Sequence, residues 1–183
     1  MRTSGSCAAS PPRSALAVTL VLGLSLPGCS GSPAPRAWAA TVCTVLSPWR
    51  AEIGTLATRT QQQMTAQTTP AQAKENLVRL FGGAEAASET ARVGVERAGV
   101  PDTDRGKDVA QSFTASLGAM RDAYGRARAG VHALPPDPKD TFYTKVATVV
   151  QTLDAEYTSS QLDTSRLDSP ELKRAFDEAP ECR

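Results

Sequence analysis

The chain has 183 residues, with 20 Lys and Arg, 19 Asp and Glu, one His and four Cys. This length fits one domain, and the formal charge of +1 excludes a strongly basic nucleic-acid binder and an acidic tail protein. A single histidine excludes a His-rich metal site. The composition therefore predicts no nucleic-acid partner.

The first 28 residues have the pattern of a secretory signal peptide. Arg2 and Arg13 are the only charges in this stretch, and an uncharged, largely apolar run follows from Ala15 to Leu26. A positive start before a short apolar run is typical of export signals. Such a run spans about 18 Å as a helix, against roughly 30 Å for the hydrocarbon core of a bilayer. A permanent transmembrane helix is therefore not expected here.

The apolar run ends in Leu26, Pro27, Gly28 and Cys29. This segment resembles the lipobox of bacterial lipoproteins, although Pro27 replaces the usual Ala, Ser or Thr. The resemblance implies cleavage after residue 28 and attachment of a diacylglycerol, with acyl chains such as palmitate, to the sulfur of Cys29. Two alternatives are ordinary signal cleavage at residues 37–39 (Ala-Trp-Ala) and a structural role for Cys29.

Cleavage before Cys29 changes the formal charge of the chain from +1 to −1, because it removes Arg2 and Arg13 and no acid. A chain with this charge has no excess of basic residues to attract lipid headgroups as a second anchor. The acyl chains alone must therefore attach the protein to the membrane. We expect a lipid-anchored protein on the extracytoplasmic face of the cell membrane. Residues 29–36 are expected to form a flexible tether and residues 37–183 a folded domain.

Two cysteines remain once Cys7 leaves with the signal and Cys29 carries lipid. These are Cys43 and Cys182, which lie at opposite ends of the folded region. In an oxidising compartment two such thiols commonly form a disulfide. The alternative is a pair of buried free thiols, whereas a zinc site is disfavoured because the chain has no Cys-x-x-Cys and one His.

Apolar residues recur at helical spacing through most of the folded region. The first stripe begins after Ala37, and Pro48 either kinks this helix or splits it. Thr69-Pro70 and Ser169-Pro170 pair a capping residue with a proline, which is typical of helix starts. The stripes consist of Val42, Leu46, Trp49, Ile53 and Leu56; Leu77, Leu80, Phe81, Ala84, Ala87, Ala91 and Val95; Val109, Phe113, Leu117, Met120, Tyr124, Ala127, Val131 and Leu134; Phe142, Val146, Val149, Leu153 and Tyr157; and Leu172 and Phe176.

Short Gly- and Pro-containing breaks at residues 99–101 and 135–138 separate the long helices. Short connections imply antiparallel neighbours, and no stretch alternates as a strand. The sequence therefore predicts an all-α, up-down-up-down four-helix bundle, with a short C-terminal helix tied back to the first helix by a Cys43–Cys182 disulfide. The Ala-rich stripes predict closely packed helices around a thin core.

Acidic clusters suggest metal sites at first sight. Asp102, Asp104 and Asp108 flank Gly106, but in a calcium loop the glycine stands sixth rather than fifth and a glutamate closes the loop. Helix capping is the favoured interpretation. A di-iron bundle needs Glu-x-x-His pairs, which Glu85, Glu89 and Glu96 do not form. Together with Arg92 and Arg97, these glutamates indicate a solvated helix face with ion pairs. No metal or cofactor is expected.

The remaining candidates have structural interpretations. His132 lies at the end of the third stripe, where the helix dipole favours a cation. The chain has no serine-nucleophile motif to accompany it, so no catalytic residue is predicted. Trp49 belongs to the core stripe, while Trp38 lies either at the membrane interface or, as we favour, over the end of the bundle. A modest positive patch, partly offset by Asp122, is expected from Arg121, Arg126 and Arg128.

The whole arrangement resembles small secreted lipoproteins of actinobacteria. The resemblance depends on residues 26–29, Val42-Cys43 with Trp49, residues 98–102 (Ala-Gly-Val-Pro-Asp) and the closing Glu-Cys-Arg of residues 181–183. It supplies no catalytic residues. We expect a monomeric, non-enzymatic module that binds a partner protein or envelope component. The alternatives are a carrier of a small apolar ligand inside the bundle and, less favoured, a cell-envelope hydrolase.

Overall fold

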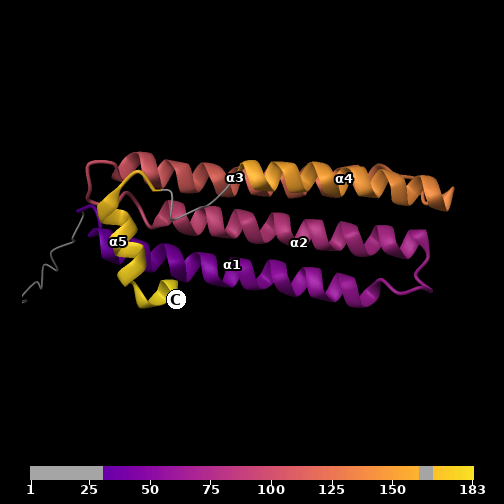
Figure 1. Cartoon of the computed structure of the whole chain (residues 1–183), viewed down its shortest axis with the longest axis horizontal. Coiled ribbons are helices and arrows are strands. Elements are labelled where there is room, and N and C mark those ends of the chain that lie inside the picture. The colour runs from indigo at the N-terminus through magenta and orange to yellow at the C-terminus, as the bar shows by residue number, and fades with distance from the viewer. Residues whose placement is uncertain (1–30, 161–166) are drawn as a thin grey trace, which may run out of the picture. The chain divides into compact units, whose positions relative to one another are not determined.

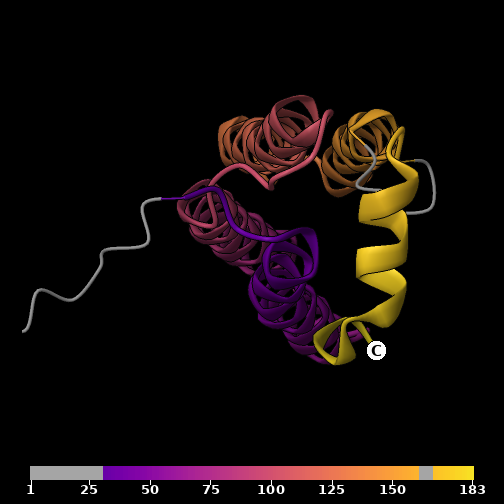
Figure 2. The same ribbon diagram turned by 90° about the vertical axis from the view of Figure 1, so that its left-hand side faces the viewer.

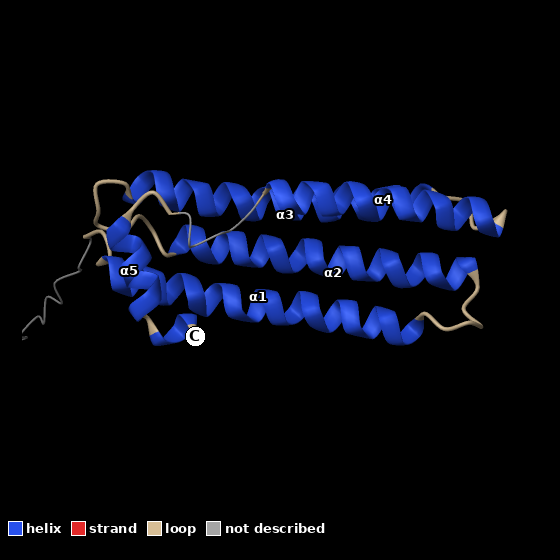
Figure 3. Cartoon of the chain, in the orientation of Figure 1, coloured by secondary structure: helices blue, strands red, loops and turns tan. Residues whose placement is uncertain are grey.

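The computed structural model describes residues 31–160 and 167–183, and the regular elements in these ranges are all helical (Figures 1 and 3). The predicted signal peptide and Cys29 lie outside the described residues. The compact unit begins at Gly31. Its elements are α1 (Pro35–Gln63), α2 (Pro70–Arg97), α3 (Gly106–Ala133), α4 (Lys139–Ser159), α5 (Pro170–Glu178) and a 3-10 turn, η2 (Pro180–Cys182).

The four long helices run alternately up and down, each packed against the next along the chain (Figure 1). In the described helices, no Cα atom of α1 lies within 8 Å of one in α4. The bundle is therefore open on the side between α1 and α4. The short helix α5 instead crosses that side at one end of the bundle (Figure 2). The predicted all-α bundle with a returning C-terminal helix is confirmed. Among the described helices, none is both long and apolar enough to cross a bilayer.

Proline and capping residues begin two of the helices as predicted. Thr69 and Gln72 form a reciprocal capping box at the start of α2, and the Ser169 hydroxyl accepts a hydrogen bond from the amide of Leu172 in α5. The start of α3 differs from expectation. Arg105 occupies the N-cap position without a side-chain capping hydrogen bond, and the helix begins only at Gly106, so neither Asp102 nor Asp104 caps it.

The first helix is continuous through Pro48, as the unbroken register of its apolar stripe indicates. It begins at Pro35, two residues earlier than expected. The preceding segment is held in place, because the carbonyl of Pro33 accepts a hydrogen bond from the amide of Asp102 at 2.9 Å. The chain therefore enters the fold beside the α2–α3 connection.

An aromatic cluster fills the α5 end of the bundle. The rings of Trp38, Phe113 and Phe176 meet with centroids 5.6–5.9 Å apart, and Leu172 is fully buried beside them. The indole N–H of Trp38 donates to the carbonyl of Gly99 at 2.9 Å. Trp38 is itself fully buried, which confirms that it covers the bundle end rather than facing a membrane.

A second apolar cluster fills the end of the bundle that holds α4. It is built mainly on α2 and α3, from Leu77, Phe81, Ala84, Tyr124, Ala127 and Val131. Burial, with a smaller contribution from Tyr157, raises the pKa of Tyr124 to about 12. Helix α4 adds partly buried Val146, Val149 and Leu153, but Phe142 is its one fully buried side chain.

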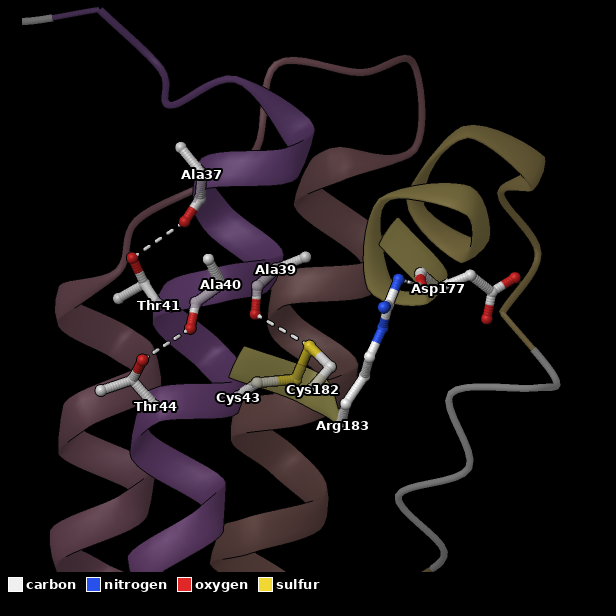
Figure 4. The surroundings of a disulfide bond; sticks show 9 residues. All are labelled: Ala37, Ala39, Ala40, Thr41, Cys43, Thr44, Asp177, Cys182 and Arg183. Carbon is white, nitrogen blue, oxygen red and sulfur yellow. Dashed lines mark hydrogen bonds between the residues drawn. A yellow bond between two sulfur atoms is a disulfide. The ribbon is translucent and has the colours of Figure 1, made fainter. Parts of the chain in front are cut away.

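The predicted Cys43–Cys182 disulfide is present and joins α1 to η2 (Figure 4). Its Cα atoms are 5.1 Å apart, and the two residues are separated by 139 positions in the sequence. At the chain end, Arg183 donates a hydrogen bond to the carbonyl of Asp177 at 3.5 Å. The bridge thus fastens the C-terminal elements to the side of α1.

Candidate binding groove between helices α1 and α2

A groove of about 750 Å³ lies between α1 and α2. It lies on the outer side of the two helices, since its walls include exposed Thr44, Pro48 and Thr90. Most of the surface that lines it is apolar. Its lining residues are Thr44, Val45, Pro48, Trp49 and Glu52 of α1 and Ala87, Glu89, Thr90, Ala91, Val93, Gly94 and Arg97 of α2.

Small side chains on α2 create this groove. A Cβ atom added at Gly94 would lie 2.8 Å from Cγ1 of Val45, so the backbone of α2 comes very close to α1. Ala87 and Ala91 continue the same small surface. Because these side chains are short, the outer seam between the two helices stays hollow.

Trp49 forms the floor of the groove. It is 5% exposed, and its indole N–H donates to the hydroxyl of Ser88 at 3.1 Å. Ser88 is fully buried and donates in turn to the carbonyl of Ala84 at 2.8 Å. This relay satisfies the polar atom of the indole and fixes the ring, so the groove has a rigid, apolar floor.

Pro48 leaves a hydrogen-bond acceptor in the groove wall. Proline has no backbone N–H, so the carbonyl of Thr44, one helical turn earlier, loses its usual intrahelical partner. The Thr44 hydroxyl donates to Ala40, and the Thr90 hydroxyl donates to Ala86. The backbone and hydroxyl oxygens of the groove are thus placed to accept hydrogen bonds, which suits a ligand with donor groups and an apolar surface.

Glu89 links the groove to an ion-pair network on α2 and α3. Its carboxylate lies 2.8 Å from the guanidinium groups of both Arg92 and Arg121, while Arg92 also pairs with Glu96 at 3.1 Å and Arg121 with Asp122 at 2.7 Å. The hydrogen bonds from Arg92, and next those from Arg121, lower the pKa of Glu89 from 4.5 to about 2. Glu89 also raises the pKa of Arg121.

The other arginines of α3 pair across helices too. Arg128 contacts Glu85 of α2 at 2.8 Å, and Arg126 contacts Glu156 of α4 at 3.0 Å. The ion-paired face predicted for the α2 glutamates is confirmed. The positive charge predicted for Arg121, Arg126 and Arg128 is offset by Asp122, as expected, and also by a carboxylate partner of each arginine on a neighbouring helix.

The structure leaves the other sequence candidates apart from the groove. His132 is exposed in the last turn of α3. Asp108 pairs with Arg105 at 3.0 Å, and Arg105 also reaches Asp168 at 2.9 Å. Within residues 31–160 and 167–183, no group of three or more His, Cys, Asp or Glu is placed to hold a metal ion.

Sequence reasoning missed Gly94, although a signal for it was present. Gly83 and Gly94 are eleven positions apart, which is three helical turns, so both lie on one face of α2. A Cβ atom at Gly83 would lie 2.8 Å from Cδ1 of Leu56, just as one at Gly94 would meet Val45. The absence of a Cβ atom at Gly83 and at Gly94 therefore lets α2 approach α1 closely at two points on the same face.

Comparisons of the chain with protein-family models, with curated proteins and with solved structures found no match.

Proposed function

We propose that this protein is a lipid-anchored, extracytoplasmic binding protein without catalytic activity, and that it binds a partner protein or envelope component through the α1–α2 groove. The groove itself carries the proposal. Its fixed Trp49 floor and the acceptor oxygens of Thr44 on α1 and Thr90 on α2 offer apolar contact together with directional hydrogen bonding. The lipobox-like segment that ends at Cys29 supports the anchor.

A small apolar ligand is the second candidate, because the lining of the groove is mainly apolar. The carrier expected from the sequence would hold its ligand inside the bundle, whereas this groove opens on the outer side of α1 and α2, and only Trp49 and Ala91 of the buried first cluster reach it. A seam between two helices suits the side chains of an extended or helical segment better than an enclosed molecule. We therefore favour a macromolecular partner.

The anchor is tested by replacing Cys29 with Ala. The variant protein should move from the membrane fraction to the soluble fraction, because it cannot carry a diacylglycerol. Wild-type protein expressed at the same level is the control. Tight membrane attachment of the variant would show that something other than Cys29 holds the protein.

The groove is tested with a photo-crosslinking amino acid in place of Thr90, on the intact anchored protein in cells. Thr148 on α4 is a matched control, because it is also an exposed helical threonine whose hydroxyl bonds to the carbonyl four residues earlier. A discrete cross-linked product is expected from position 90 and not from position 148. Equal products from both positions, or none from position 90, would contradict binding in the groove. A lipid-sized adduct at position 90 would favour the small-ligand candidate.

A further inference from the structure

The chain enters the folded body at a fixed point. The carbonyl of Pro33 accepts from the amide of Asp102, and a Cβ atom at Gly99 would lie 3.9 Å from Cδ of Pro33. Both contacts hold Pro33 against the α2–α3 connection. Helix α1 follows at once, from Pro35.

Only a short length of chain separates this point from the proposed lipid. Cys29 precedes Pro33 by four residues, and an extended chain spans at most about 3.6 Å per residue, so the link reaches no more than about 14 Å. This step rests on the proposed function, because it takes Cys29 as the acylated residue. An anchor this short limits which end of the body can meet the membrane.

We propose that the α2–α3 connection faces the membrane surface and that the groove binds a segment of another protein held in the same membrane. At the α2–α3 end, Val100 is 42% exposed between Gly99 and buried Pro101, so an apolar side chain meets the lipid surface there. Exposed Asp102, Asp104 and Arg105 follow it along the same connection. The opposite end carries the α1–α2 connection, where a hollow of about 490 Å³ is lined almost entirely by polar side chains. That end suits contact with water rather than lipid.

The groove lies in the half of the body nearest this proposed contact. Along α2 it extends from Arg97, the last residue of the helix, back to Ala87. Ten residues of helix span about 15 Å, and the link from Cys29 to Pro33 adds at most about 14 Å. The whole groove therefore lies within about 30 Å of the lipid surface. A partner embedded in the membrane can present a segment at that height, whereas a soluble or wall-bound partner gains nothing from so short an anchor.

Energy transfer from two labelled positions tests the orientation. Val100→Cys at the proposed contact and Ala66→Cys in the α1–α2 connection are labelled with a donor dye on full-length acylated protein, without reduction of the disulfide. The protein is placed in phosphatidylethanolamine and phosphatidylglycerol vesicles that contain an acceptor-labelled lipid. Helix α2 has 28 residues, so the two sites are about 40 Å apart.

Transfer should be several-fold more efficient from position 100 than from position 66. Equal transfer, or stronger transfer from position 66, on vesicle-bound protein would overturn the orientation while leaving the anchor intact. Wild-type protein that does not bind the vesicles at all would overturn the proposed anchor and this inference with it. The labelled variants must keep the wild-type thermal midpoint, which both exposed positions permit.

The nature of the partner is tested with a cleavable photo-crosslinker at position 90. After cross-linking in cells and cleavage of the linker, the released partner should stay in membranes washed with alkaline carbonate. A partner found in the soluble or cell-wall fraction would overturn this part of the inference. The Thr148 position again serves as the matched control.

Discussion

The two ends of the bundle enclose their apolar side chains in different ways. At one end the nine-residue helix α5 crosses the open side of the bundle and buries Leu172, Ala175 and Phe176. At the other end the 21-residue helix α4 lies along α3, barely approaches α2, and buries Phe142 alone. The short helix placed across the bundle thus buries a larger fraction of its side chains than the longer helix placed along one neighbour.

The difference has a covalent and a geometric cause. The disulfide holds η2, and with it α5, against α1, so α5 stays where α1 and α4 leave a gap. Helix α4 has no such tie in the described residues, and Val150 and Tyr157 remain 43% and 40% exposed. The α5 end should therefore be the more stable of the two, and α4 the first helix to open.

Loss of the disulfide should have the largest effect on this comparison. Cys43→Ala with Cys182→Ala should lower the free energy of unfolding by about 3–5 kcal/mol, because the bridge closes a loop of 139 positions. Denaturant unfolding of the two proteins measures the change. Thiol titration of unreduced, denatured wild-type protein should find no free thiol at either position, and an unchanged unfolding midpoint would show that packing alone holds α5.

Aromatic truncations should separate the two ends next. Phe176→Ala removes a ring that is 6% exposed and stacks on Phe113, so it should cost about 3–5 kcal/mol. Tyr157→Ala removes a ring that is 40% exposed and should cost less than about 1 kcal/mol. Thermal unfolding of both variants tests the contrast. Equal losses would mean that α4 is as firmly packed as α5.

Sequence periodicity predicted the helices but not this contrast. The spacing of Val146, Val149 and Leu153 matches that of a core stripe, yet these side chains are only partly buried. Periodicity identifies the apolar face of a helix, whereas burial also depends on which neighbours cover that face. The position of α5 across the open side depends on the disulfide and on tertiary packing. The sequence therefore could not show that α5 buries its apolar face more fully than α4.

The groove was predictable only in part, for a similar reason. Trp49 belongs to the predicted core stripe, whereas the sequence leaves open whether Pro48 kinks or splits the first helix. The hollow itself depends on the position of Gly94 against Val45 across two helices. The partners of the α3 arginines likewise depend on the register between helices, which no single helix pattern contains.

Glycine substitutions should show the same contrast at smaller scale along α2. Gly94→Ala should destabilise by about 1–2 kcal/mol, because the new Cβ would meet the stiff, β-branched Val45 at 2.8 Å. Gly83→Ala meets the flexible end of Leu56 at the same distance, so the helix propensity gained, about 1 kcal/mol, should offset the contact. Denaturant midpoints measure both variants, and a larger loss for Gly83→Ala would reverse the comparison.

The smallest effect is expected at Glu89, which joins the groove to the ion pairs of α3. Its pKa is lowered from 4.5 to about 2 in the folded state, so the carboxylate stabilises the fold at every pH above about 4.5. That contribution is lost as the pH falls from about 4.5 through 2, where the folded protein takes up the proton. Water screens this exposed group, which keeps the effect small.

Glu89→Gln should accordingly lower the thermal midpoint slightly near pH 6 and have less effect as the pH approaches about 2. Glu171→Gln provides the control, because Glu171 is exposed on α5 and the described residues give it no ion-pair partner. A difference between wild type and Glu89→Gln that stayed constant from pH 6 to pH 2 would show that the Arg92 and Arg121 contacts do not favour the carboxylate. If the difference in thermal midpoint shrinks over this range for Glu89→Gln and not for Glu171→Gln, the effect comes from the ion pairs of Glu89 with Arg92 and Arg121. It would then not come from the general charge of the protein.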